Sequence, residues 1–198
     1  QTKHVIVNGR AMRLLQGGSG KPLLFLHGWP STPPSYRHAL ELLAKGFTVY
    51  APYMFDVRCK TAYCIANCLK SMLKELGITG VFVVGTSFGG TVASLLAHDK
   101  ELVSHLLLVN TAGVPRQASF AKMFANLLKS SAFMLAHGRV EHIFYRFSAA
   151  FGFFASLRHR EMRKLFSEIK SSTKTHSCYI FQNIAAKATL VWCTKDFM

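Results

Sequence analysis

Val81-Phe82-Val83-Val84-Gly85-Thr86-Ser87-Phe88-Gly89 places a serine where an apolar, β-branched strand must turn sharply into a helix. Gly85 and Gly89 supply the two positions at which a side chain would collide with the opposing backbone. The pattern Gly-x-Ser-x-Gly between a strand and a helix is a nucleophile elbow, which pushes the serine hydroxyl out of the sheet. Ser87 is therefore the candidate nucleophile, and the alternative is a glycine turn without chemistry.

The segments around this stretch alternate between strand and helix patterns. Strands are predicted at 4–15 (a hairpin turning at Asn8-Gly9), 22–26, 47–51, 81–84, 103–109 and 189–193, and helices at 33–43, 61–76 and 92–97. Regular alternation of this kind is typical of the α/β class, with a mostly parallel sheet and helices on both of its faces.

Residues 114–187 interrupt the alternation, because no strand pattern occurs there and the apolar residues recur at helical spacing. This segment holds 10 of the 16 phenylalanines and 12 Lys or Arg against 3 Glu. We expect a helical cap inserted before the last strand, with aromatic residues facing the sheet domain and cations facing water. The predicted domains are a core at 1–113, the cap at 114–187, and a core strand with its following loop at 188–198.

The composition and charge indicate which classes of binding partner to expect. The net charge of +15 favours anionic partners or surfaces, but neither zinc-ligand spacing nor a basic reading helix accompanies it, so nucleic-acid binding is not expected. No signal peptide and no 18-residue apolar run is present, which favours a cytoplasmic location. Residues 147–155 of the cap are apolar enough for peripheral membrane contact as an alternative to cap packing.

Five cysteines, an odd number, argue against a disulfide framework and suit a reducing compartment. Cys64 and Cys68 lie one helical turn apart. This spacing allows half of a metal site, but two small apolar residues on a buried helix face is the preferred interpretation. No metal or organic cofactor is expected.

A serine hydroxyl needs a general base, an acid that orients the base, and donors for the oxyanion. The backbone N–H of Phe88 begins the helix after the elbow and points toward the expected oxyanion. His27-Gly28-Trp29-Pro30 follows a predicted parallel strand, and Gly28 allows a backbone turn that faces the N–H of Trp29 toward the site.

These motifs resemble the α/β-hydrolase fold superfamily, specifically its cap-bearing branch of esterases, cofactor-free haloperoxidase-like enzymes and epoxide hydrolases. The resemblance rests on His27-Gly28-Trp29-Pro30, on the elbow, and on Leu190-Val191-Trp192-Cys193-Thr194-Lys195-Asp196. It implies that Ser87 is the nucleophile, that Trp29 and Phe88 form the oxyanion hole, and that Asp196 is the triad acid. Asp196 as a plain loop residue is the alternative, and the role implied for His27 is to hold its loop.

The resemblance also implies a serine hydrolase of small ester-like substrates, working through a Ser87 acyl-enzyme. A serine at position 87 argues against epoxide hydrolase chemistry, in which a carboxylate attacks. None of the nine histidines occupies the family position of the catalytic base, beyond the acid and one further strand, and the loop after Ala51-Pro52 departs from the family pattern. We therefore expect a fragment of a longer hydrolase. The alternative is a non-catalytic scaffold whose basic, aromatic cap binds an anionic partner or a membrane surface.

Overall fold

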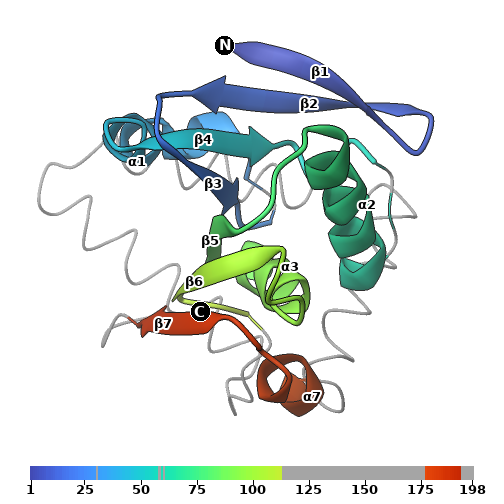
Figure 1. Ribbon diagram of the computed structural model, residues 1–198, viewed down its shortest axis with the longest axis vertical. Coiled ribbons are helices and arrows are strands. Elements are labelled where there is room, and N and C mark those ends of the chain that lie inside the picture. Colours follow the sequence, from blue (N-terminus) through green and yellow to red (C-terminus); the bar gives the residue numbers. More distant parts are fainter. Residues whose placement is uncertain (30, 58, 60, 113–176, 193–198) are drawn as a thin grey trace, which may run out of the picture.

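The computed structural model describes residues 1–29, 31–57, 59, 61–112 and 177–192. In these residues a seven-stranded sheet has the order β1-β2-β4-β3-β5-β6-β7 (Figure 1). The strands are β1 Thr2–Val7, β2 Arg10–Gly17, β3 Lys21–Leu26, β4 Phe47–Pro52, β5 Val81–Thr86, β6 Val103–Val109 and β7 Lys187–Val191. The two β2 pairings are antiparallel, and all pairings from β4 to β7 are parallel.

The described helices are α1 Arg37–Leu43, α2 Ala62–Glu75, α3 Phe88–Leu96 and α7 Ser177–Gln182, and a 3-10 turn, η1 Pro33–Tyr36, precedes α1. Figure 1 shows α2 and α3 on one side of the sheet and α1 on the other. Among the described helices, none is long and apolar enough to cross a membrane.

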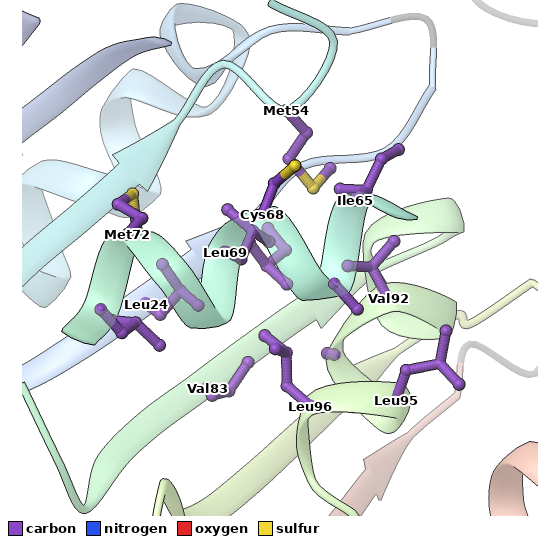
Figure 2. Packing of buried hydrophobic residues seen from close by; sticks show 14 of the residues in the cluster. Leu24, Met54, Ile65, Cys68, Leu69, Met72, Val83, Val92, Leu95 and Leu96 are labelled. Carbon is purple, nitrogen blue, oxygen red and sulfur yellow. The ribbon is translucent and has the colours of Figure 1, made fainter. Parts of the chain in front are cut away.

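The faces of β3 show why helices cover both sides of the sheet. Side chains alternate between the faces of a strand, and Leu24 and Leu26 belong to the core cluster formed with α2 and α3, whereas Leu23 and Phe25 pack with Leu40 of α1. Figure 2 shows the first cluster, in which apolar residues of α2 and α3 meet those of β3 and β5. The predicted α/β class, with a mostly parallel sheet and helices on both faces, is confirmed.

The hairpin between β1 and β2 also forms as predicted. Asn8 and Gly9 both have positive φ, 51° and 75°, which are the backbone angles of the two-residue turn that matches strand twist.

The last described elements differ in detail from the expectation. β7 begins at Lys187, two residues before the predicted strand, and α7 lies within the range assigned to the cap. Ile180 of α7 is 4% exposed and packs in the core cluster, and the His98 ring is hydrogen-bonded through Nε2 to the Ile180 carbonyl at 2.8 Å. Residues 113–176, which carry most of the predicted cap, lie outside the described residues.

The interpretation of Cys64 as a small apolar packing residue is wrong. Cys64 forms a disulfide with Cys59, which precedes α2. Cys68 is a free, buried thiol, as a position on the inner helix face requires. The helical spacing of Cys64 and Cys68 does not indicate the bond to Cys59, which lies five residues before Cys64 and outside the helix.

Candidate active site

Because of the strand register, the segments that follow β3, β5, β6 and β7 all begin at one edge of the sheet. Leu26 at the end of β3 pairs with Gly85 of β5, Thr86 pairs with Val109 at the end of β6, and Val109 pairs with Val191 at the end of β7. In parallel sheets ligands bind beyond these carboxyl ends. The segments after β3, β5, β6 and β7 therefore start side by side, and the elbow lies among them.

Ser87 has a left-handed backbone conformation with φ 49° and ψ −123°, which a residue with a side chain rarely adopts. Its N–H donates to the carbonyl of Val109 at 3.1 Å, and its carbonyl accepts from the N–H groups of Gly90 and Ala112 at 2.9 and 3.0 Å. The strain persists because hydrogen bonds fix the peptide groups on both sides of the residue.

The glycines of the elbow are sterically required. A Cβ at Gly85 would lie 2.7 Å from the Ala93 side chain and from the backbone of Gly89 and Gly90, and a Cβ at Gly89 would collide with the carbonyl oxygens of Leu26 and His27. Backbone atoms cannot yield as a flexible side chain can. The first turn of α3 is thereby pressed against the end of β3.

The loop after β3 lies against the elbow through Gly28. A Cβ at Gly28 would lie 3.1 Å from the Cβ of Ser87 and 3.3 Å from the hydroxyl of Tyr36. The Gly28 N–H donates to that hydroxyl at 3.2 Å, and the Ser31 hydroxyl donates to the Gly28 carbonyl. Trp29 follows, half-buried against the core cluster.

His27 is fully buried, and both nitrogens of its ring are engaged. Nδ1 lies 3.0 Å from the Gly28 carbonyl, and Nε2 accepts from the Met54 N–H at 3.4 Å. Burial lowers the pKa of His27 to about 4, although the Gly28 carbonyl and Asp56 act in the opposite direction. The neutral ring thus joins the loop after β3 to the loop after β4.

The loop after β4 lies beside the elbow as well, in addition to the loop after β3. The Phe55 ring meets the His27 ring edge-on at 5.5 Å and stacks on the Phe88 ring at 6.0 Å. Asp56 accepts two side-chain hydrogen bonds from Arg13 of β2, each 2.8 Å long. Burial raises the pKa of Asp56, but the bonds from Arg13 and its charge outweigh burial and leave that pKa below the usual value.

The structure thus brings together His27, Gly28, Gly85, Ser87, Phe88 and Gly89, and it places Trp29 next to them. Asp196 lies outside the described residues, as do the histidines of the predicted cap. Tyr36, Met54 and Phe55 are neighbours that the sequence argument missed. The departure from the family pattern after Ala51-Pro52 marked the loop that carries two of them.

The comparisons with known proteins agree with this arrangement. A family described as the alpha/beta hydrolase fold matches residues 21–135, more than half of the chain. The chain belongs to the α/β-hydrolase fold family. The matched range contains the loop after β3, the elbow and α3, which are the elements that form the candidate site.

Among curated relatives of this α/β-hydrolase chain, the soluble epoxide hydrolase of Corynebacterium sp. (strain C12) is 33% identical over 118 residues, covering 53% of the chain and 40% of the relative. Epoxide hydrolase 2 of Siraitia grosvenorii is 35% identical over 102 residues, covering 45% of the chain and 31% of the relative. The chain therefore spans well under half the length of these relatives.

Solved structures share the fold over nearly the whole chain. The N-formylmaleamic acid deformylase of Pseudomonas putida S16 has a TM-score of 0.66 at 19% identity, covering all of the chain and 84% of the deformylase. The bromoperoxidase of Bacillus anthracis has a TM-score of 0.69 at 14% identity, covering 97% of the chain and 81% of the peroxidase. At these identities the likeness establishes the fold.

Proposed function

We propose that this chain carries the nucleophile and oxyanion site of a serine hydrolase that cleaves small esters or related carbonyl compounds. The observation that carries the proposal is the left-handed Ser87, seated at the carboxyl edge of the sheet against Gly28. Family membership and the hydrolase relatives support hydrolytic chemistry.

In the proposed reaction, Oγ of Ser87 attacks the carbonyl carbon and loses its proton to a general base. The tetrahedral oxyanion accepts hydrogen bonds from the main-chain N–H groups of Phe88 and Trp29, and the N-terminus of α3 adds a favourable dipole. Collapse expels the alcohol, which takes up the proton and leaves an acyl group on Ser87. Water then attacks the acyl carbon and releases the acid.

The base and the acid of this reaction come from outside the described residues. We propose Asp196 as the acid that orients a histidine base, because in sequence it comes soon after β7, whose last residue, Val191, pairs with Val109 beside the elbow. His27 does not suit the part of base, since its two ring nitrogens face Gly28 and Met54.

The epoxide hydrolase relatives suggest a different substrate, and the chemistry of position 87 decides between the two. A carboxylate that opens an epoxide forms an ester, which water can cleave. A serine that opens an epoxide would form an ether. Water does not cleave an ether near neutral pH, so the enzyme would stop after one turnover. Ser87 therefore favours carbonyl substrates.

The test compares Ser87→Ala with Ser104→Ala in the complete protein encoded by the reading frame, any sequence after Met198 included. Ser104 donates to the Gly80 carbonyl, far from the elbow. With p-nitrophenyl acetate we expect Ser87→Ala to lower kcat/KM by about 1,000-fold or more and Ser104→Ala to leave it unchanged. Rapid quench should yield an acetylated Ser87 peptide. Equal hydrolysis by Ser87→Ala, or turnover of an aryl epoxide without ester hydrolysis, would overturn the proposal.

The net charge of +15 supports a second proposal, in which the basic cap binds an anionic membrane surface with or without catalysis. Residues 113–176, which carry most of this cap, lie outside the described part of the chain. Co-sedimentation with vesicles of anionic phospholipid should fall steeply between low and high salt, and salt-independent or absent binding would contradict it.

A further inference from the structure

Three cysteine sulfurs meet where the loop after β4 joins α2. The disulfide connects Cys59 of the loop to Cys64 in the first turn of the helix, and the sulfur of Cys68 lies 3.6 Å from that of Cys59. All three sulfur atoms lie within 4.8 Å of one another. A free thiol thus lies about in van der Waals contact with one sulfur of a disulfide.

Cys68 is a buried thiol with a polar neighbour. Cys68 lies on the buried face of α2 (Figure 2), 8% exposed. The side-chain amide of Asn8 donates to its sulfur at 3.7 Å. Asn8 reaches α2 from the β1–β2 turn, where its positive φ of 51° shapes the hairpin. The thiolate is the form that attacks a disulfide, and the Asn8 amide is a hydrogen-bond donor at the sulfur that would attack.

The surroundings of Cys64 suit a leaving sulfur. Cys64 is the third residue of α2, whose N-cap is Thr61. The N-terminus of a helix favours negative charge, and a leaving thiolate that is stabilised departs faster. The two cysteines that can bond to Cys59 therefore have different polar surroundings. Cys68 has the side-chain amide of Asn8 next to its sulfur, and Cys64 lies at the N-terminus of α2.

We propose that Cys59, Cys64 and Cys68 form a thiol–disulfide exchange centre. The Cys68 thiolate attacks Sγ of Cys59, a Cys59–Cys68 bond forms, the Cys59–Cys64 bond breaks, and Cys64 leaves as a thiolate that takes up the proton lost by Cys68. No net oxidation occurs. In the reduced cluster, the Cys59 thiolate attacks a small disulfide such as oxidised glutathione, a mixed Cys59–glutathione disulfide forms, and one reduced glutathione leaves. Cys64 or Cys68 then attacks the Cys59 sulfur and expels the second reduced glutathione, so that the cluster is oxidised and the small disulfide is reduced. The proposal is independent of hydrolase activity.

The test uses a background in which Cys178 and Cys193 are replaced by serine. In Cys64→Ser, pre-reduced and exposed to oxidised glutathione, we expect an intramolecular Cys59–Cys68 disulfide. In Cys64→Ser with Cys68→Ser, the Cys59–glutathione adduct should persist at least about tenfold longer. Equal persistence of the adduct in both variants would overturn the proposal.

The wild-type cluster supplies a measurement that needs no change at the three cysteines. Trypsin leaves Cys64 and Cys68 together in the peptide 61–70. Tandem mass spectrometry that breaks this peptide between Cys64 and Cys68 shows which of the two carries the disulfide-linked Cys59 peptide. After equilibration in glutathione buffer, both bonds should occur. Detection of the Cys59–Cys64 bond alone, or stoichiometric zinc uptake by the reduced protein without either disulfide, would contradict an exchange centre.

Asn8→Asp provides a matched variant at the turn, because aspartate also tolerates positive φ. It replaces the donor by a carboxylate, so resolution by Cys68 should slow by about threefold or more, whereas resolution by Cys64 in a Cys68→Ser background should not change. Equal slowing of both would assign the effect to the fold of the hairpin and overturn the role of Asn8.

Discussion

The elbow at 85–90 and the loop after β4 flank the same site but are held in different ways. The elbow depends on backbone contacts: Ser87 is fixed by main-chain hydrogen bonds, and Gly89 fits against the carbonyl of Leu26. The loop depends on side chains, with Asp56 bound to Arg13 and the Met54 N–H bound to His27.

The difference predicts how the elbow and the loop after β4 respond to added side-chain volume, to pH and to redox conditions. A backbone-packed turn has no titratable or oxidisable group, so pH, salt and redox conditions leave it unchanged, but one added methyl group disrupts it. A loop held by a buried imidazole, an ion pair and a nearby disulfide tolerates small changes in shape and responds to pH and redox conditions.

The largest effect is expected from Gly89→Ala. The new methyl group would collide with the carbonyl oxygens of Leu26 and His27, and α3 cannot withdraw without separating from β3. Overpacking against backbone should lower the free energy of unfolding by about 3 kcal/mol or more. Chemical denaturation monitored by circular dichroism measures this loss.

Gly46→Ala is the matched control. A Cβ at Gly46 would meet nothing within 4 Å, and its φ is not positive, so we expect stability close to that of the wild type. Similar losses in both variants would mean that the elbow has no special steric requirement.

Acid should weaken the loop contact through His27. Its pKa is about 4 in the folded protein, because of burial, and 6.5 when unperturbed. Between these values the unfolded chain binds a proton that the folded chain does not, so the free energy of unfolding falls as pH falls from 6.5 to 4. The full loss is about 3 kcal/mol, and above pH 6.5 this group contributes no pH dependence.

Denaturation of the wild type at pH 7 and pH 5 checks this expectation against His27→Asn and His27→Gln. Their amides occupy positions similar to Nδ1 and Nε2 but do not titrate in this range. The wild type should lose more stability than either variant on acidification, by about 2 kcal/mol. Parallel losses in all three proteins would contradict a neutral, buried His27.

A smaller effect is expected from Asp56→Asn, which weakens the paired hydrogen bonds from Arg13. Since the side chains of Arg13 and Asp56 are 49% and 20% exposed, solvent screens the pair, and the loss should be about 1 kcal/mol. Glu41→Gln is the control, because the Arg37–Glu41 pair on α1 is far more exposed and should give no measurable change. A larger loss of stability in Glu41→Gln than in Asp56→Asn would contradict the expectation that the less exposed ion pair contributes more.

The same contrast explains what the sequence revealed. The elbow and the Asn8-Gly9 hairpin were predictable because both depend on adjacent residues whose backbone requirements are local. The ends of β3 and β6 followed from apolar runs, whereas β5 extends two residues beyond its apolar run, to Thr86. Parallel pairing then brought Gly28 and Ser87 to one edge. Asp196 stays a prediction, since its surroundings lie outside the described residues.

The loop after β4 was not predictable by such means. Its partners lie far away in sequence: Asp56 is 43 residues from Arg13, and Met54 is 27 from His27. No local pattern specifies such pairs, because they depend on the order of strands in the sheet. Only Arg13 and Asp56 have opposite charges, and many other pairs in the chain would satisfy that criterion.

The smallest effect is expected where the two kinds of support meet, at Tyr36. Its hydroxyl accepts from the Gly28 N–H at 3.2 Å, so a side chain holds the backbone next to Ser87. Tyr36→Phe should lower the free energy of unfolding by less than about 1 kcal/mol but accelerate hydrogen exchange of the Gly28 amide by severalfold, because the opening is local. Tyr63→Phe, at an exposed position of α2, should change neither quantity. If Gly28 exchange stays unchanged in Tyr36→Phe, the Tyr36 hydroxyl does not hold the Gly28 amide, and the proposed side-chain support next to Ser87 is wrong.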